Sequence, residues 1–310
     1  MTDFGRGEDM DDDWLAGRFE GNRVRLRAMA YRMLGSASDA EDAVQEAWIR
    51  ASSASADEVA NLDGWFTTIV ARICLDMLRS RKTRREAPGW DELDSGAEAL
   101  ARDDEGPEQE AVLADSVGLA LLVVLDTLAP AERVAFVLHD MFGVPFDEIA
   151  GITGRSPDAA RQLASRARRR VQGDDAAQPG GAGNVSGERL ARQRAVADAF
   201  LAASRGGDLA GLLAVLDPDV VLHADPAAAP SGAPAVLHGA RAVAYGARAA
   251  SVRSRHSAVA LIDGVPGIVY APGGRAALVL AFSYRGDLIS AIDVIADPDR
   301  LEALELAVPG

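Results

Sequence analysis

Two stretches without a sustained apolar period divide this chain of 310 residues into three parts. Residues 87–109 are acidic and hold three glycines and two prolines, and residues 173–187 (GDDAAQPGGAGNVSG) are almost entirely small or polar. Such a composition is typical of linkers, because it leaves little apolar surface to bury. We therefore expect three folded parts, at residues 14–86, 110–172 and 188–304.

The composition excludes several classes of protein. No apolar run approaches the length of a membrane-spanning helix, and the acidic N-terminus (MTDFGRGEDMDDDW) is unlike a secretory signal. We therefore expect a cytoplasmic protein without a membrane partner. Cys74 is the only cysteine, which excludes an internal disulfide, and no Cys/His cluster has the spacing of a zinc site. We predict neither a metal nor a cofactor.

Charge is unevenly distributed along the chain. The formal net charge is -15, which by itself opposes binding to nucleic acid. Positive charge nevertheless gathers in two runs, RSRKTRRE at residues 79–86 and RSPDAARQLASRARRR at residues 155–170. These runs are candidate nucleic-acid contacts within an otherwise acidic protein.

The first part is predicted to consist of helices. In residues 36–53 (SASDAEDAVQEAWIRASS), Ser38 can cap a helix with Glu41 at the capping-box spacing. The residues of this helix predicted to face the core are Ala40, Ala43, Val44, Ala47, Trp48 and Ala51, and those on the opposite side are Asp39, Asp42, Gln45, Glu46 and Ile49. A second amphipathic helix runs from Asp63 into the first basic run, and an earlier helix spans residues 24–34.

The second part is predicted to hold four helices, at residues 116–128, 131–142, 145–152 and 156–171. The turn TGR separates the last two. Ser156 is a suitable N-cap, and Pro157 suits the first helical position. Two helices joined by a tight turn that contains glycine are typical of a DNA-binding helix-turn-helix. The alternative is a solvated surface helix.

The last of these helices would present polar side chains to DNA. Its apolar positions, Ala160, Leu163 or Ala164, Ala167 and Val171, are predicted to face inward. Arginine and glutamine can bind base edges, while serine and further arginines can hold phosphates. The candidate contacts are Arg155, Ser156, Asp158, Arg161, Gln162, Ser165, Arg166, Arg168 and Arg169. Residues 155–162 are predicted to contact bases, and residues 166–170 to position the helix.

The third part mixes helices and strands. Helices are predicted at residues 188–204 and 208–216, with another after residue 238. Strands are predicted at residues 220–225, 258–263, 267–271, 276–284 and 288–296. Helices followed by a curling antiparallel sheet predict an α+β fold.

The first two parts resemble a known family. SDAEDAVQEAW, followed by DGWFTTIVARICLDMLRSRKTRRE, resembles the second conserved region of the extracytoplasmic function (ECF) sigma factors. TLAPAERVAFVLHDMFGVPFDEIAGITGRSPDAARQLASRARRRV resembles their fourth region. The third part resembles the SnoaL-like branch of the NTF2-like fold, as in ECF sigma factors of the SigJ type. The resemblance implies a helical bundle, a helix-turn-helix domain and a cone-shaped α+β domain.

The resemblance also implies partners and contacts. The partners are core RNA polymerase, through its β′ clamp helices and β flap, and promoter DNA. Asp39, Asp42, Gln45 and Glu46 match the face that binds the clamp helices. Region 4 would bind the -35 element, and residues 87–109 would pass through the polymerase. The residues implied for the -10 element are Asn61, Asp63, Thr68, Arg72, Arg79, Arg81, Lys82, Arg84 and Arg85, with Asn61 and Asp63 in a loop ahead of the second helix.

For the third part, the resemblance implies a regulatory domain that contacts the sigma part of the same chain. Related folds also include isomerases, cyclases and hydrolases with a pocket acid or base. The candidate pocket residues are His223, His238, Tyr284 and Asp293, with His256, Tyr270 and Asp263 as further candidates. None has a spacing that specifies a reaction, so we predict no catalytic residue and no enzyme. Two alternatives stay open: a ligand-responsive DNA-binding regulator, and a SnoaL-like isomerase or hydrolase fused to a DNA-binding module.

Overall fold

The computed structural model describes residues 6–54, 59–85, 118–173, 183–229, 232–251 and 253–309. The acidic linker predicted at residues 87–109 lies outside these ranges. Within them, no helix is both long and apolar enough to cross a membrane. The chain divides into two compact units, residues 1–113 with 128–168 and residues 114–127 with 169–310, and each is described by itself.

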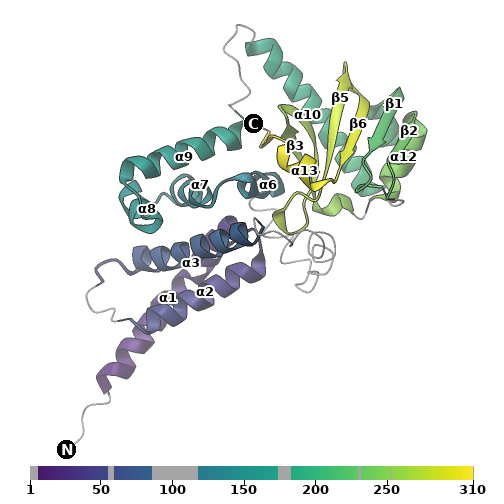
Figure 1. Ribbon diagram of the computed structural model, residues 1–310. Helices are drawn as coiled ribbons and strands as arrows, with labels where there is room; N and C mark the ends of the chain where they lie inside the picture. The colour runs from purple at the N-terminus through teal and green to yellow at the C-terminus, as the bar shows by residue number, and fades with distance from the viewer. Residues whose placement is uncertain are drawn as a thin grey trace, which may run out of the picture. The chain divides into compact units, whose positions relative to one another are not determined.

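The first unit begins with three helices that pack against one another, α1 (Arg6–Leu34), α2 (Ala37–Ser52) and α3 (Leu62–Arg85) (Figure 1). Phe19 of α1 lies at their centre, with its ring centroid 5.2 Å from that of Trp48 and 5.1 Å from that of Phe66. The inward positions predicted for α2 are buried, except for the half-buried Trp48. Cys74 is buried as well, which raises the pKa of its thiol to about 12.

Two local predictions for these helices are wrong. Helix α1 begins at Arg6 rather than at residue 24, because Leu15 and Phe19 extend the buried face that Leu26 continues. The N-cap of α2 is Ser36 rather than Ser38. The backbone of Ser36 is extended, as an N-cap requires, and its hydroxyl accepts a hydrogen bond from the Asp39 amide at 3.3 Å.

The other elements described in the first unit are also helical. It contains α7 (Pro130–Phe136), the π-helical turn η1 (Val137–Met141), α8 (Phe146–Thr153) and α9 (Pro157–Gln172) as far as residue 168. The single helix predicted at residues 131–142 therefore changes its winding at Val137. Helix α3 packs against α7 and α8, and α1 packs against η1.

The second unit contains α6 (Leu119–Thr127), the C-terminal end of α9, and a mixed α/β domain. The helices of this domain are α10 (Gly183–Gly206), α11 (Leu209–Val215), α12 (Ala240–Ala249) and α13 (Pro298–Ala303), with the short 3-10 turns η3 (Arg253–His256) and η4 (Pro272–Gly274). Its strands are β1 (Leu216–Ala224), β2 (Ala235–His238), β3 (Ser257–Ile262), β4 (Val265–Tyr270), β5 (Leu278–Arg285), β6 (Leu288–Ile295) and β7 (Leu306–Ala307).

Among the described residues these strands form one sheet in the order β2-β1-β6-β5-β4-β3-β7. The prediction of an all-antiparallel sheet is wrong, because β1 pairs with β6 in parallel. The chain leaves β1, forms β2 and α12, and returns through β3, β4 and β5, so that β6 arrives beside β1 in the same direction. Strands β2 and β7 were not predicted, since four and two residues are too short to show a period.

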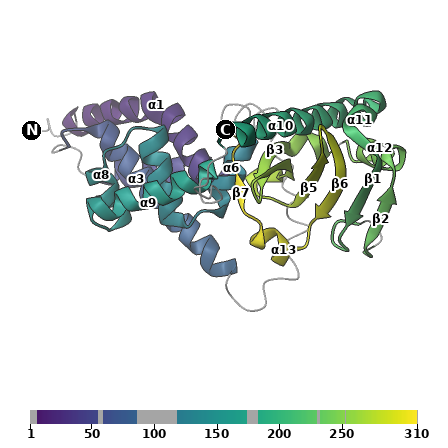
Figure 2. The ribbon, with the colours of Figure 1, turned by 90° about the horizontal axis from the view of Figure 1, so that it is seen from above.

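Helices cover one face of this sheet, as Figure 2 shows for α10 above the strands. Phe200 of α10, Leu212 of α11 and Val243 of α12 are buried against Phe282 and Ile292 of the sheet. Helix α6 of the same unit contacts β3, β7 and η4, and Asp126 lies 3.7 Å from the Arg275 guanidinium. Helical regions followed by an α+β domain confirm the predicted fold class.

Candidate promoter and polymerase interfaces

The start of α3 holds the residues predicted for the -10 pocket. The Asn61 side-chain oxygen accepts a hydrogen bond from the Gly64 amide at 3.1 Å, so Asn61 caps the helix. Because α3 begins at Leu62, Asp63 lies in its first turn and not in the preceding loop. Thr68 follows one turn later, and its hydroxyl donates to the Gly64 carbonyl at 2.9 Å. The predicted pocket residues are therefore held on a helix start.

Helix α1 supports this helix start with two residues that the sequence analysis missed. Asn22 donates from Nδ2 to Oδ1 of Asp63 at 2.8 Å. Arg25 donates from Nη2 to the Thr67 hydroxyl at 2.7 Å and to the Asp63 carbonyl at 3.3 Å. The available signal was the spacing of Arg18, Asn22 and Arg25, which places three polar residues on one face of α1.

A hollow of about 290 Å³ lies beside these residues. Region-2 residues line one side of it: Arg25, Asn61, Asp63, Gly64 and Thr67. The segment from η1 to α8 lines the other side: Phe142, Gly143, Val144, Pro145 and Glu148. The hollow thus has amide, carboxylate, hydroxyl and guanidinium groups on its region-2 side, which suit the edge of an unstacked base.

The basic residues along α3 differ in their surroundings. Arg72 donates to the Gly151 carbonyl at 3.2 Å, and Arg79 lies 3.6 Å from the Asp76 carboxylate. Arg81 is half-buried, because its guanidinium donates to the Leu34 carbonyl at 2.9 Å and pairs with Asp39. Lys82 and Arg84 are exposed, and the side chain of Arg85 lies outside the described part of the chain. Arg81 therefore joins α3 to α2 within the fold.

The predicted polymerase-binding face lies along α2. Asp42 and Gln45 are exposed, and the Glu46 carboxylate lies 2.9 Å from the Arg50 guanidinium. Ile49, one turn after Gln45, keeps 58% of its surface exposed. Asp39 is directed to Arg81 instead. The arrangement leaves an acidic and polar surface with one apolar side chain, which can complement a basic partner helix.

The helix-turn-helix has the local geometry that its sequence predicts. Gly154 ends α8 with φ of 68°, a left-handed conformation that glycine adopts without strain. Ser156 then caps α9, since its hydroxyl accepts from the Ala159 amide at 3.2 Å. All the positions predicted to face inward are buried: Ala160, Leu163, Ala164, Ala167 and Val171.

The outward arginines of α9 fall into two groups. Arg166 lies 3.0 Å from the Glu132 carboxylate, and Arg168 donates through Nε to Asp140 at 2.8 Å, so both bind other helices of the first unit. Arg161 pairs with Asp158 on the same helix at 2.5 Å and lies over the Phe146 ring. Among the described residues, the exposed side chains of Arg155, Gln162, Ser165 and Arg169 form no hydrogen bond or ion pair.

We expect Arg161→Ala to weaken binding to a duplex with the -35 element by about 1–3 kcal/mol, and to relax discrimination at one base position, because the bidentate base contact predicted for Arg161 would be lost. Arg170→Ala, near the helix end, should weaken binding equally for all sequences. Fluorescence anisotropy of holoenzyme with duplexes mutated one base pair at a time measures both effects. Equal losses of discrimination for the two variants would contradict the assignment.

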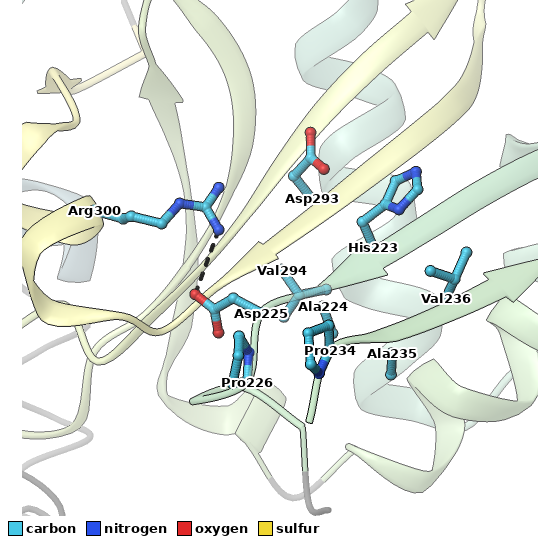
Figure 3. A pocket seen from close by; sticks show the side chains of 10 residues that line it. All are labelled: His223, Ala224, Asp225, Pro226, Pro234, Ala235, Val236, Asp293, Val294 and Arg300. Atoms are coloured by element: carbon cyan, nitrogen blue, oxygen red, sulfur yellow. Dashed lines mark ion pairs between the residues drawn. The ribbon is translucent and has the colours of Figure 1, made fainter. Parts of the chain in front are cut away.

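Of the candidate pocket residues in the C-terminal domain, only two lie side by side. His223 of β1 and Asp293 of β6 are register partners, and Figure 3 shows their side chains beside a hollow of about 290 Å³. Both are exposed, whereas their strand neighbours Leu222 and Val294 pack toward the helices, so the hollow opens on the other face of the sheet. His238 is exposed at the end of β2.

Tyr284 packs on the helix side of the sheet, where its hydroxyl donates to the Pro266 carbonyl at 2.8 Å and burial raises the pKa of the phenol. The interior between helices and sheet is occupied by apolar side chains such as Phe200 and Phe282. An imidazole beside a carboxylate on an open surface can bind a polar group. Among the described residues, no hydrogen bond connects His223 with Asp293.

Asp225, at the floor of this hollow, is a structural carboxylate. It is buried, yet its oxygens accept hydrogen bonds from the amides of Ala228, Ala296 and Asp297 at 2.8 to 2.9 Å, with Arg300 at 3.6 Å (Figure 3). Although burial acts to raise the pKa of this carboxyl, the amides and Arg300 outweigh it and hold the pKa below its ordinary value.

This depressed pKa predicts a pH dependence of stability. A carboxyl whose pKa is lower in the folded state stabilises the fold above its unfolded pKa of about 3.9, and loses that effect as pH falls through the folded pKa. Asp225→Asn should cost about 1–3 kcal/mol at pH 7, because an amide cannot accept on both sides, and should flatten the stability profile below pH 4. Urea denaturation from pH 3 to 7 checks this, with exposed Asp219→Asn as control. Parallel profiles for the two variants would contradict it.

Comparisons with known proteins match this arrangement. Residues 19–84 match the model of sigma-70 region 2, and residues 118–171 match that of sigma-70 region 4. A Mycobacterium tuberculosis protein named "Probable ECF RNA polymerase sigma factor SigI" is 33% identical over 96% of this chain and 98% of its own length. The ECF RNA polymerase sigma factor SigJ of the same organism is 41% identical over 70% of this chain and 67% of its own length.

The chain therefore belongs to the ECF RNA polymerase sigma factors. This confirms the family indicated by the sequence motifs of the first two parts. The crystal structure of the M. tuberculosis ECF sigma factor SigJ is similar as well, with 32% identity, coverage of 92% of this chain and 98% of that one, and a TM-score of 0.43.

Proposed function

We propose that this chain binds core RNA polymerase through the exposed face of α2 and directs it to promoters. In this proposal the start of α3 binds the -10 element, and the start of α9 binds the -35 element. The observation that carries it is the presence of both sigma-70 regions in one chain, with Asp42 and Gln45 exposed on one helix and Arg155 and Gln162 exposed on another. The protein would act in the cytoplasm and without catalysis of its own.

The charge distribution supports dependence on polymerase. A chain with a formal net charge of -15 should bind DNA weakly by itself, and two arginines of its recognition helix are already paired with carboxylates of α7 and η1. Polymerase would hold regions 2 and 4 at the spacing of the two promoter elements. Two weak attachments to one DNA molecule then act together, because the second becomes intramolecular.

We also propose that the C-terminal domain tunes this activity from within the chain. Helix α6 supports this, because it lies within the region-4 match, yet it contacts β3 and β7 of the second unit. The resemblance implies that the polymerase β flap is a partner of the sigma part of the chain. A C-terminal domain that holds α6 can therefore alter how region 4 meets the polymerase.

Run-off transcription with purified core polymerase tests the proposal. Promoter-specific initiation that requires the full chain supports it, and a change in activity after truncation at Val171 supports tuning by the C-terminal domain. Operator binding by the lone chain without initiation would instead favour a ligand-responsive regulator. Turnover of a small molecule that depends on His223 or Asp293 would favour a fused enzyme.

A further inference from the structure

We propose that the hollow beside His223 and Asp293 binds a small organic amine, a molecule with one cationic amino group and a compact apolar body. The Asp293 carboxylate would bind the amino group, the His223 imidazole would accept a second hydrogen bond from it, and Val236 would contact the apolar body. The inference is independent of the promoter contacts proposed for regions 2 and 4, because every residue that lines this hollow belongs to the second unit.

The hollow lies on the face of the sheet opposite to the helices. Leu222 and Val294 pack toward the helices, so their strand neighbours His223 and Asp293 point to the other face. These two residues are register partners on the parallel strands β1 and β6, which places their side chains next to each other (Figure 3). The volume of about 290 Å³ is close to the lower limit of small-molecule pockets, about 300 Å³.

The two central polar groups do not hold the fold together. Among the described residues, the exposed side chains of His223 and Asp293 take part in no hydrogen bond or ion pair. Asp225 at the floor differs from them, because its carboxylate accepts hydrogen bonds from three backbone amides and lies 3.6 Å from the Arg300 guanidinium. Asp225 therefore builds the hollow, while His223 and Asp293 are available to a ligand.

The floor of the hollow is preformed. Asp225 directly follows β1, and its carboxylate accepts from the amides of Ala296 and Asp297, which follow β6, at 2.9 Å each. These bonds join the ends of the two strands. Pro226 and Pro234 line the hollow as well, and the ring of a proline fixes its φ. A preformed site loses less conformational entropy on binding than a flexible one, which favours affinity.

The charges of the lining favour a cation. Arg300 and Asp225 neutralise each other, and Asp293 then leaves a formal charge of about -1 when histidine is counted as neutral. An alkyl amine is protonated at pH 7 and can donate a charge-assisted hydrogen bond to the Asp293 carboxylate. An anionic ligand would instead be repelled by Asp293 and would compete with Asp225 for Arg300.

The apolar part of the lining determines where the body of the ligand lies. Val236 of β2 is the register partner of His223 and keeps 48% of its surface exposed. The order across the three strands is therefore Val236, His223 and Asp293. An amino group at Asp293 places the apolar body over Val236 and the adjoining prolines, where its burial removes apolar surface from water. The imidazole between them can accept from the same amino group.

Three probes that share one apolar body test the inference: phenethylamine, 2-phenylethanol and 3-phenylpropionate. Each is titrated at pH 7 into the full chain with isotope-labelled histidine, and the imidazole signals of its four histidines are followed by NMR. The signal lost in His223→Gln identifies His223. We expect phenethylamine to shift that signal with a dissociation constant of about 1 mM or lower, and the other two probes to bind at least about tenfold more weakly.

Two variants separate the charge from the apolar contact. Asp293→Asn keeps the shape of the side chain and removes its charge, so phenethylamine should bind about tenfold more weakly while 2-phenylethanol binds as it does to the wild type. Val236→Ala should weaken all three probes by a similar factor. The matched control is Asp219→Asn, an exposed carboxylate of β1 outside the lining, which should leave every probe unchanged. The His139 signal, from the first unit, provides an internal reference.

Equal binding of the three probes to the wild type would reduce the hollow to an apolar patch and overturn the inference. Tighter binding of 3-phenylpropionate would reverse the assigned charge, and unchanged phenethylamine binding by Asp293→Asn would remove the assigned carboxylate. Either result also overturns it. Failure of the proposed function is recognised separately, as the absence of promoter-specific initiation in run-off transcription, and it leaves these binding results unaffected.

Discussion

The double substitution Asp42→Arg with Gln45→Arg is expected to lower binding to core polymerase by more than about 100-fold and to abolish promoter-specific transcription. Both side chains are exposed on α2, so the fold should tolerate the change. The proposed partner is a basic pair of clamp helices. Like charges brought together across an interface cost several kcal/mol, and each 1.4 kcal/mol is about tenfold in affinity.

The measurement is co-migration or fluorescence anisotropy with purified core polymerase, at two salt concentrations. The control is Ala195→Arg with Asp198→Arg on α10, which adds the same charge at the same helical spacing on exposed positions of the other unit. Wild-type affinity is expected for the control. If both variants lose affinity equally, net charge and not the α2 face governs the interaction, and the assignment of this face is wrong.

The helices of region 4 could be predicted closely because their signals are local. Ser156, Pro157 and Gly154 act through caps and backbone conformation within one turn of the chain, and the structure places them as the sequence indicates. The inward face of α9 follows from a period that depends on no other element. The strands β3 to β6 were also predicted, since each is bounded by turn residues.

What could not be predicted depends on which elements meet. Periodicity places Arg166 and Arg168 on the outward side of α9, but it does not show that Glu132 and Asp140 approach them from other helices. Nor does it show that Arg81 of α3 pairs with Asp39 of α2. The parallel pairing of β1 with β6 joins strands between which the chain forms four other strands and helix α12. Non-local contacts of this kind leave no signal in the local sequence, because each side chain or strand could pair with many other parts of the chain.

These ion pairs change how the basic runs are interpreted. The sequence suggests two dense cationic footprints, whereas the structure leaves a smaller exposed set that includes Arg155, Arg169 and Arg84. Arginines bound to carboxylates of the same unit contribute less to phosphate binding, since their charge is already neutralised. Affinity for DNA should therefore have a shallower salt dependence than the count of arginines in residues 155–170 implies.

The largest expected loss of stability in the second unit is that of Gly267→Ala. Gly267 lies in β4, between β3 and β5, and a Cβ there would be 2.5 Å from the backbone oxygen of Leu280 and 2.4 Å from Cδ1 of Ile262. Ile262 can move its terminal methyl, but the Leu280 carbonyl belongs to the neighbouring strand and can retreat only if β5 separates from β4. We expect a cost of about 3 kcal/mol, at the upper end of overpacking effects.

Hydrogen exchange of β3 to β5 measures this loss of stability within the second unit. Tryptophan fluorescence reports separately on the folding of the first unit, because all four tryptophans lie in its residues 14–90. Gly187→Ala in α10 is the control, since nothing lies within 4 Å of its added methyl and alanine favours a helix. Faster exchange in the β strands of Gly267→Ala is expected, with unchanged exchange in Gly187→Ala. The proposed contacts with promoter DNA lie in regions 2 and 4, outside the sheet. Comparing transcription initiation by Gly267→Ala with that by the wild type then shows whether the folded sheet restrains or supports those contacts. Unchanged exchange at β4 would mean that the strands can separate to admit a methyl group, which contradicts the tight β4–β5 pairing.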